Sequence, residues 1–319
     1  MKPAISIETQ LEPVQALDRL SCLLDRFQVS ARLFHTGALC GISTFEAQPG
    51  RGFFHVLRAG EMVVTHRQGT GLARRIEARE PTLFFYPQAL THRFHNAPKD
   101  GADFTCASVY FEGGANHPLV QALPPLIVLP LAKVPGLAGA LTLLFEEADA
   151  VRCGHRLIAD RLFEVVLLQL LRWLLDHGRE SGIAIGLVSG LADPQLARAL
   201  TAMHEHPEVS WTVESLADRA AMSRSAFASA FKKTVGVTPA DYLTDWRLAI
   251  ARKRLRQGQA VKAIAPALGY ANASALSRVF AQRVGMSPRE WLAQVESQEG
   301  ESQDGESQDA MPGPTSIKT

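Results

Sequence analysis

The C-terminal third contains the stretch IAPALGYANASALSRVFAQRVGMSPREW (residues 264–291), which repeats an earlier stretch, LADRAAMSRSAFASAFKKTVGVTPADY (residues 216–242). From Ser223 and Asn272 onward, matching landmarks lie 49 residues apart, and before the turn they lie 48 apart. The second copy therefore carries one extra residue in its turn. Chance does not keep such a register over some 27 positions, so the two stretches are two copies of one structural unit.

Each copy predicts a short amphipathic helix, a tight turn and a second helix. The first helices are expected at residues 212–220 and 260–268, and Ser223 and Asn272 are suited to cap the second helices. Gly236 and Gly285 are expected to end those helices. Residues 240–257 predict one continuous helix between the units. The second helices each bury an apolar pair four residues apart, which leaves the opposite side available to a DNA groove: Phe227 with Phe231, and Leu276 with Phe280.

The charge of this region favours a nucleic-acid partner. Residues 204–295 contain 13 Lys and Arg against 7 Asp and Glu, a net charge of +6, while the whole chain carries only +1. The remaining residues therefore sum to −5. A locally basic surface supplies the attraction to phosphate that does not depend on base sequence.

These residues resemble the AraC family of transcription regulators. The resemblance covers about 100 residues and includes Ile264-Ala265, Gly269-Tyr270, Arg278-x-Phe280, Gly285-x-Ser287-Pro288 and Trp291, together with Trp246-Arg247-Leu248 in the joining helix. It implies a seven-helix domain that inserts two recognition helices into successive major grooves of double-stranded DNA. Pro266 departs from the pattern, because a proline inside a helix removes a backbone hydrogen bond and is expected to loosen the second unit.

The resemblance also assigns DNA-contacting residues. Positions that face bases are Arg224, Ser225, Ala228 and Ser229 in the first unit, and Ala273, Ser274, Ser277 and Arg278 in the second. Lys232, Lys233 and Arg283 are expected to contact phosphates. Arginine can bind guanine through two hydrogen bonds, whereas alanine can touch only a thymine methyl group.

The first 115 residues predict many short strands, among them residues 53–57, 61–65, 82–86 and 104–111. Pro87-Gln88-Ala89-Leu90-Thr91-His92-x3-Asn96 resembles the second motif of cupins, with Ala89 in place of glycine. The expected fold class is α+β in two domains. The first is a cupin-like antiparallel β-barrel with a helical pair at residues 137–148 and 156–177. The second is an all-α domain with two helix-turn-helix units.

The longer helix of the pair, residues 156–177, is apolar around most of its circumference. A helix that packs against one partner needs a narrower apolar stripe. We therefore expect it to form a homodimer contact, with a fully buried core helix as the alternative.

The cupin resemblance does not extend to the usual metal ligands. Residues 45–53 contain no histidine, and His92 alone cannot build a three- or four-ligand site. We therefore expect no catalysis, no metal and no cofactor. The alternatives are a cupin metalloenzyme with a DNA-binding appendage and metal binding without catalysis through His55, His92 and His95.

The four cysteines, at positions 22, 40, 106 and 153, are too few and too scattered for a disulfide framework. Cys40, at an expected strand start, and Cys106, in an expected strand, resemble those of the AraC subgroup with a cysteine-bearing cupin, some members of which respond to oxidants or electrophiles. An oxidised cysteine would pair with a nearby partner. The alternative is that both are apolar core residues. His55 and His92 are further candidates for effector contacts, and Cys22 and Cys153 are expected to be structural.

The expected organisation is a sensory and dimerisation domain at residues 1–185, a DNA-binding domain at residues 191–295 and a disordered acidic tail at residues 296–319. No secretory signal or membrane span is found, so we expect a cytoplasmic regulator. A small molecule or oxidant would control it, with RNA polymerase as a further partner and no membrane. A constitutive DNA-binding dimer without ligand sensing is the remaining alternative.

Overall fold

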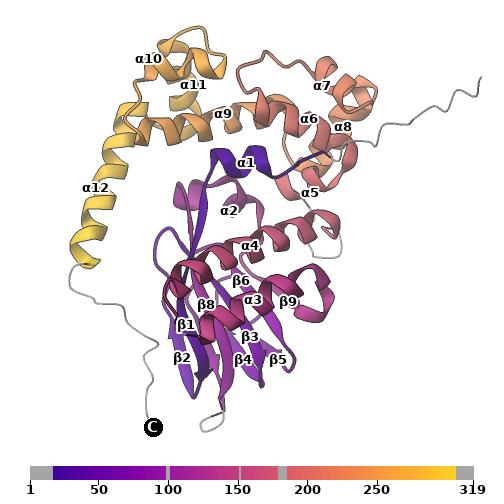
Figure 1. Cartoon of the computed structure of the whole chain (residues 1–319). Coiled ribbons are helices and arrows are strands. Elements are labelled where there is room, and N and C mark those ends of the chain that lie inside the picture. The colour runs from indigo at the N-terminus through magenta and orange to yellow at the C-terminus, as the bar shows by residue number, and fades with distance from the viewer. Residues whose placement is uncertain (1–16, 98–100, 151, 179–184, 307–319) are drawn as a thin grey trace, which may run out of the picture.

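A computed structural model describes residues 17–97, 101–150, 152–178 and 185–306, and it places an N-terminal β-rich half beneath a C-terminal helical half (Figure 1). The five-stranded sheet has the order β1-β8-β3-β6-β9 and the four-stranded sheet the order β2-β7-β4-β5, and the pairings are antiparallel. The strands are β1 (Val29–Leu39), β2 (Ile42–Phe45), β3 (Arg51–Ala59), β4 (Met62–His66), β5 (Arg75–Ala78), β6 (Thr82–Tyr86), β7 (His92–His95), β8 (Ala102–Phe111) and β9 (Ile127–Pro130).

Strand β3 shows why the sequence forms two sheets with helices on one side. Alternate side chains of a strand point to opposite faces, and every residue from Gly52 to Leu57 is buried. Phe53 and Leu57 belong to the apolar cluster between the two sheets. Phe54 and Val56 belong to the cluster that the helices cover. A strand buried on both faces needs this continuous apolar run.

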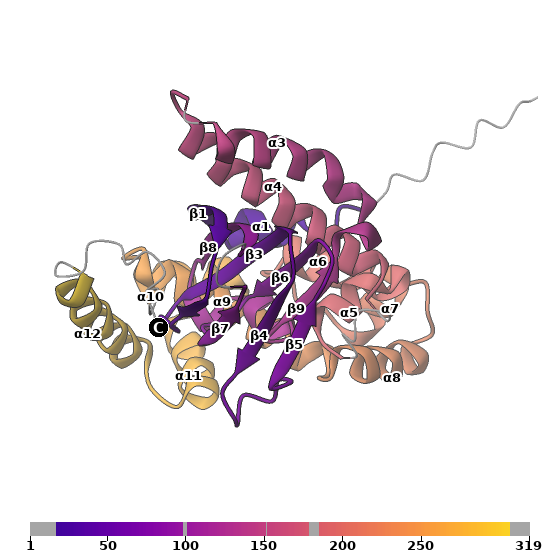
Figure 2. The same cartoon turned by 90° about the horizontal axis from the view of Figure 1, so that it is seen from below.

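The helices α3 (Ala138–Asp149) and α4 (His155–Asp176) cover the outer face of the five-stranded sheet (Figures 1 and 2). These bounds agree with the predicted helical pair. The Asp160 carboxylate accepts a hydrogen bond of 2.6 Å from the Leu33 backbone N–H, where the β1–β8 pairing shifts register between Leu33 and His35. An unpaired strand N–H is thereby satisfied by the helix.

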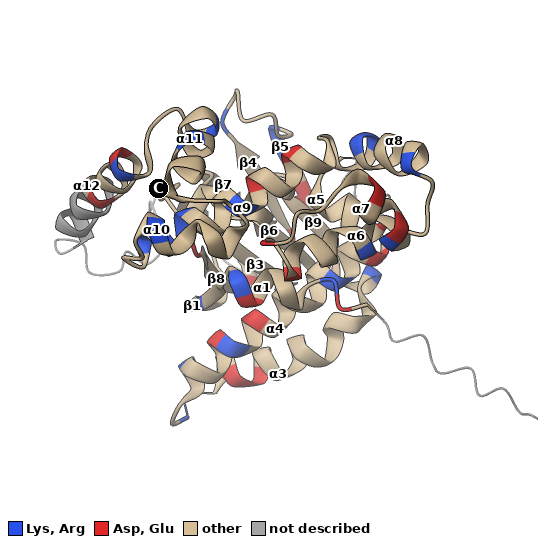
Figure 3. Ribbon diagram, turned by 90° about the horizontal axis from the view of Figure 1, so that it is seen from above, with Lys and Arg blue, Asp and Glu red and all other residues tan. Residues whose placement is uncertain are grey.

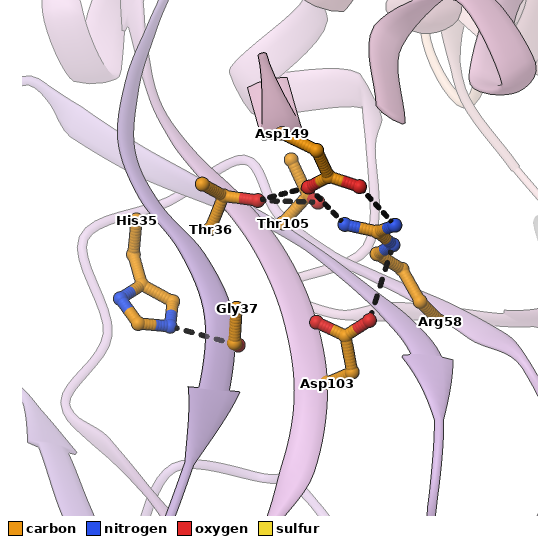
Figure 4. A network of polar contacts seen from close by, with 7 residues as sticks. All are labelled: His35, Thr36, Gly37, Arg58, Asp103, Thr105 and Asp149. Carbon is orange, nitrogen blue, oxygen red and sulfur yellow. Dashed lines mark hydrogen bonds and ion pairs between the residues drawn. The ribbon is translucent and has the colours of Figure 1, made fainter. Parts of the chain in front are cut away.

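A charged network fixes the end of α3 to the strands (Figure 4). Both guanidinium Nη atoms of Arg58 lie 2.6 Å from the Asp149 carboxylate oxygens. Arg58 Nε lies 3.4 Å from Asp103, and Thr36 donates a hydrogen bond to Asp149. Hydrogen bonds from Arg58 lower the pKa of Asp149. Because the paired geometry is bidentate and Arg58 is mostly buried, this contact orients α3 more firmly than a single surface ion pair would.

The remaining helices are α1 (Ser21–Arg26), α2 (Pro118–Ala122), α5 (Leu187–Ala192), α6 (Pro194–Glu205), α7 (Val213–Arg219), α8 (Arg224–Val235), α9 (Pro239–Arg256), α10 (Val261–Ile264), α11 (Ala273–Val284) and α12 (Pro288–Glu306). Short 3-10 turns occur at Gly114–Asn116, Leu131–Lys133, Pro135–Leu137 and Pro266–Leu268. The predicted fold class, an antiparallel β domain with a helical pair and an all-helical C-terminal domain, is confirmed.

The caps of α8 and α11 follow the sequence prediction. Ser223 and Asn272 occupy the N-cap positions, and each side chain accepts a hydrogen bond from the backbone N–H three residues later. Gly236 and Gly285 end the helices with φ of 93° and 86°, a left-handed conformation that favours glycine. Both helices have 12 residues, so the 49-residue offset in the sequence is an offset between two equivalent helices.

Pro266 shortens the first helix of the second unit without opening its turn. Helix α10 ends at Ile264, and a 3-10 turn from Pro266 to Leu268 follows. The Tyr270 N–H still donates to the Ala265 carbonyl at 3.0 Å, as Met222 N–H donates to the Ala217 carbonyl at 3.0 Å in the first unit. The expected break is therefore present, but the same hydrogen bond closes both turns.

Two boundaries differ from those expected. Helix α5 begins at Leu187, between the two expected domains at residues 1–185 and 191–295, and its Leu187, Val188 and Leu191 are buried. Helix α12 continues to Glu306, past the expected start of the tail at residue 296, because this segment is rich in Glu and Gln, which are good helix formers. The rest of the expected tail, residues 307–319, lies outside the described residues. No helix in the described ranges has both the length and the apolar character needed to cross a bilayer.

The turn positions Ala221 and Gly269 give a matched pair of stability predictions. Both have positive φ, 53° and 77°, which costs a residue with a Cβ about 1–2 kcal/mol. A Cβ on Gly269 would also overlap the Glu208 carbonyl oxygen. Gly269→Ala should therefore destabilise the protein by at least about 2 kcal/mol, whereas Ala221→Gly should stabilise it by about 0.5 kcal/mol after the entropy of glycine is subtracted. Urea unfolding measures both, and equal shifts of the two midpoints would contradict the argument.

Candidate nucleic-acid interface and sensory core

The outer sides of α8 and α11 carry the predicted DNA-contacting residues. Phe227, Phe231, Leu276 and Phe280 are buried, so the opposite side of each helix faces solvent. The predicted residues are exposed or half-exposed: Arg224, Ser225, Ala228, Ser229, Lys232 and Lys233 on α8, and Ala273, Ser274, Ser277, Arg278 and Arg283 on α11. The sequence prediction thus identified accessible positions on both helices.

The two helices lie along one edge of the molecule. Figures 2 and 3 view the protein from opposite sides, and both show α8 and α11 at the same edge, with α9 between the two units. Figure 3 shows basic residues on both helices. Helix α9, the spacer helix, has 18 residues, which corresponds to about 27 Å, and it holds the two units apart.

Arg283, which is expected to contact phosphate, forms ion pairs within the protein. Its guanidinium pairs with Asp241 on α9 and lies 3.9 Å from Asp245. Hydrogen bonds from Thr238 and then Arg283 lower the pKa of Asp241. The pair joins α11 to the spacer helix. A phosphate would have to compete with Asp241 for this arginine.

Contacts between α9 and the N-terminal half were not predicted from the sequence. The Lys253 ammonium donates to Glu112 at 2.8 Å and to the Arg26 backbone carbonyl. The rings of Phe27 and Trp246 meet edge to face with centroids 5.2 Å apart. These partners are more than 100 residues apart in the sequence, and no local pattern indicates them. The spacer helix thus packs against the β-rich half as well as against both helical units.

Between the two sheets, His55 and His92 lie in an aromatic-histidine core formed with Phe45, Phe53, Tyr86 and Phe94. The His92 Nδ1–H donates to the Leu90 carbonyl, at 2.8 Å. In the neutral form its Nε2 must then accept the 3.0 Å hydrogen bond from His55 Nε2–H. His55 Nδ1 is left buried without a partner among the described residues.

Burial holds both histidines neutral. It lowers the pKa of His92 to about 3 and that of His55 well below its usual value, because an imidazolium loses hydration between the sheets. The Tyr86 ring stacks on His92 at 4.0 Å, and its hydroxyl donates to His66 Nε2 at 2.9 Å. The two predicted effector residues are therefore brought together, but among tightly packed rings.

His95 does not join this pair. It lies three residues from His92 on β7, so it faces the other side of that strand, and it bonds to the Thr65 hydroxyl at 2.8 Å. In the described ranges, no group of three or more His, Cys, Asp or Glu side chains has the arrangement of a metal site. The alternative in which His55, His92 and His95 share a metal ion is thus not supported by their positions.

The two candidate redox cysteines are separated by the strand register. Cys106 on β8 lies opposite His35, whereas Leu39 lies opposite Ala102. Cys40 follows Leu39 in the turn after β1 rather than starting a strand, which places it roughly 16 Å along the sheet from Cys106. A disulfide needs Cα atoms within about 7 Å. Cys40 is exposed, while Cys106 is buried and its pKa is raised by desolvation.

The other two cysteines also differ in environment. Cys22 lies in α1, and its Sγ is 3.4 Å from the Glu205 carboxylate. Burial raises the pKa of the Cys22 thiol to about 11. Cys153 lies in the turn before α4 and is exposed.

The two halves also match known domain families. A cupin family model matches residues 18–176, and a helix-turn-helix domain model matches residues 216–294. An AraC-like transcription regulator from Streptomyces lividans is 41% identical over 181 residues, 56% of this chain and 59% of the relative. One from Streptomyces antibioticus is 39% identical over 184 residues, 57% and 60% of the two chains. The chain thus spans about three fifths of the length of these relatives.

Among solved structures, the DNA-binding domain of AdpA in complex with a target DNA is 29% identical, with a TM-score of 0.30 over 33% of this chain and 96% of that chain. The fold, the paired units and the family matches together define a cupin domain fused to a double helix-turn-helix domain. The chain thus combines a cupin domain with a helix-turn-helix domain of the AraC type, as the sequence resemblance predicted, and the two Streptomyces relatives are named AraC-like transcription regulators.

Buried histidines predict a loss of stability in acid. Burial lowers the pKa to about 3 for His92 and His204 and to about 4 for His117, against about 6.5 in the unfolded chain. Between these values the unfolded chain binds more protons. The free energy of unfolding should therefore fall by up to about 1.4 kcal/mol per pH unit for each histidine as pH decreases from about 6.5 to 4.

Urea unfolding at pH 7, 6 and 5 measures this slope. His92→Gln should make it shallower, whereas His206→Gln, at an exposed position, should leave it unchanged. Equal slopes for wild type and His92→Gln would show that His92 does not contribute.

Proposed function

We propose that the protein is a sequence-specific DNA-binding transcription regulator whose binding is controlled by a signal received through the cupin domain. It acts as a homodimer in the cytoplasm and affects transcription together with RNA polymerase. The names of the two Streptomyces relatives support the transcriptional role. The observation that carries the proposal is the pair of equivalent, equally capped helices α8 and α11 along one edge.

The chemistry of that edge suggests a division of labour. Arg224 and Arg278 can each bind a guanine edge through two hydrogen bonds. Lys232 and Lys233, in the last turn of α8, are suited to phosphate as point charges. The serines and alanines between them distinguish bases weakly. We therefore expect Arg224 and Arg278 to account for most of the sequence preference.

Arg278→Ala and Lys232→Ala test this division. Binding sequences are first selected from a random duplex library, and affinities are then measured by fluorescence anisotropy at several salt concentrations. Arg278→Ala should reduce the ratio of specific to non-specific affinity by roughly 5- to 150-fold. Lys232→Ala should weaken both alike and lower the salt slope by about 1.

Arg93→Ala, at an exposed position on β7, is the matched control and should change neither quantity. Equal losses on all sequences for Arg278→Ala and Lys232→Ala would refute the assigned roles.

The dimer proposal rests on apolar side chains that α3 and α4 leave in solvent. Leu157 is 73% exposed, Leu143 56%, Ile158 47%, Leu168 42% and Val165 41%. The other side of α4 is fully packed on the five-stranded sheet. Apolar residues gathered on one helical pair are a feature of protein interaction sites. The homodimer contact expected from the sequence would cover them.

Charged substitutions in this patch should produce monomers. Val165→Glu with Leu168→Glu places two carboxylates in the proposed contact, so the dimer should dissociate by at least 10-fold more readily in sedimentation equilibrium. Val209→Glu, at an apolar residue exposed elsewhere, is the control. An unchanged association constant in the double variant would place the dimer contact on another surface.

The signal has two candidate forms, and the geometry favours a small molecule over a Cys40–Cys106 disulfide. Cys106 is buried and protonated and lies far along the sheet from Cys40. An oxidant or electrophile would react at an exposed thiol such as Cys40. If Cys40→Ser abolishes an oxidant response and Cys106→Ser does not, the signal is an oxidant that acts on Cys40 without forming a Cys40–Cys106 disulfide.

A further inference from the structure

The region between the two sheets is filled by side chains, whereas the region between the two domains contains a cavity. The aromatic-histidine core fills the region between the sheets with buried rings. A cavity of about 350 Å³ lies instead between the cupin domain and the DNA-binding domain. This volume falls within the usual range for small-molecule sites, about 300–1,000 Å³.

The cavity is lined by apolar residues together with polar and charged ones, among them Asn116, Gln121 and Tyr242. Apolar atoms come from both domains: Pro118 and Ala122 of α2, Leu187 at the start of α5, and Val235, Val237, Trp246, Leu248 and Ala249 of the helical domain. Arg252 and Arg283 supply positive charge, and Asp245 supplies one carboxylate. Asp245 is 3.9 Å from Arg283, which is itself paired with Asp241.

Arg252 is the unusual residue of this cavity. It is about half buried, and desolvation lowers its pKa. No carboxylate of the described residues lies within ion-pair distance of it, and its Nε is buried without a hydrogen-bond partner. Burying a guanidinium in this way costs free energy that a nearby anion would offset.

Two neighbouring cations differ from Arg252 in their position or pairing. Lys253 binds Glu112. Arg256 lies over the Trp291 ring at 5.1 Å, and its Nε is also buried without a hydrogen-bond partner among the described residues, but Arg256 does not line the larger cavity. Arg252 also lines an adjoining cavity of about 90 Å³, shared with Arg256 and Lys253. The local charge between the domains is therefore positive, and Arg252 lies where the two cavities share a wall.

We propose that the cavity between the domains binds a small organic anion, a carboxylate or sulfonate on an apolar body, with Arg252 as its counterion. Binding at this site does not depend on the proposed function; only the further statement that the anion is a signal rests on it. Its walls come from α2 of the cupin domain, from α8 and α9, and from α11 through Arg283. A bound anion therefore touches the supports of both recognition helices and the domain they pack against.

Two fluorescent probes of matched shape test the site on the full-length protein. The anion 8-anilinonaphthalene-1-sulfonate and the neutral N-phenyl-1-naphthylamine share the same ring system and differ by the sulfonate. Energy transfer from Trp246, which lines the cavity, reports binding there; loss of transfer in Trp246→Phe identifies that signal.

Arg252→Met should weaken the sulfonate probe at least 10-fold while changing the neutral probe less than 2-fold. Arg254→Met, the same substitution on the same helix outside both cavities, should leave both probes within 2-fold of wild type. Arg252→Lys should retain most of the sulfonate affinity, which separates loss of charge from loss of folding. Ala249→Phe, which fills the cavity, should weaken both probes.

Equal sulfonate affinity in Arg252→Met and Arg254→Met would overturn the site, as would a parallel loss of the neutral probe in Arg252→Met. DNA binding is then measured with and without the sulfonate probe. If the probe binds through Arg252 but leaves DNA affinity unchanged, the site is supported and the proposed signal role fails. A change in DNA affinity that Arg252→Met abolishes supports both.

Discussion

Helix α9 must satisfy two packing surfaces at once, and the arrangement of the whole molecule depends on this requirement. Its Leu243, Trp246, Leu248, Ile250, Ala251 and Leu255 are all buried. These side chains belong to one continuous apolar cluster that extends from the helix-turn-helix units into the cupin domain. Trp246 alone contacts Phe27 of the cupin side and His204 of α6. A movement of α9 away from either the helix-turn-helix units or the cupin domain would therefore expose apolar surface.

This constraint explains how a change in one half could reach the recognition helices. Helices α8 and α11 are each short and would not hold a fixed separation alone. Their spacing comes from α9, reinforced by the Arg283–Asp241 pair. The cupin domain contacts α9 through Lys253 and Phe27. Coupling then needs no long pathway, because the cupin domain and both helix-turn-helix units contact the same helix, α9.

The sequence predicted well those features that local chemistry determines. Ser223, Asn272, Gly236 and Gly285 each act within one helical turn, so a residue pattern is enough to place them. Pro266 likewise acts locally: α10 ends at Ile264, but the turn that follows keeps the hydrogen bond found in the first unit. The positions of the exposed residues on α8 and α11 follow from the apolar pairs that face inward.

The features that the sequence could not reveal depend on register and long-range packing. Whether Cys40 and Cys106 meet is decided by the β1–β8 alignment, in which Cys106 lies opposite His35. Nothing near Arg283 indicates that Asp241, 42 residues earlier, occupies its guanidinium. The end of α12 was also misplaced, since a polar composition fits an extended helix as well as a tail. Such contacts are set by tertiary structure, which single-residue preferences do not specify.

The filled core of the cupin domain bears on where regulation can act. Between the sheets, His55 and His92 bind one another and are surrounded by rings, so a ligand there would have to displace well-packed apolar surface, at roughly 25 cal/mol for each Å² exposed. Between the domains, the space already exists and the unpaired charge of Arg252 favours an anion. An anion in the cavity between the domains would not have to displace packed side chains, and it would contact α9 directly. The cupin domain then serves as one wall of the site and as the surface against which α9 is held.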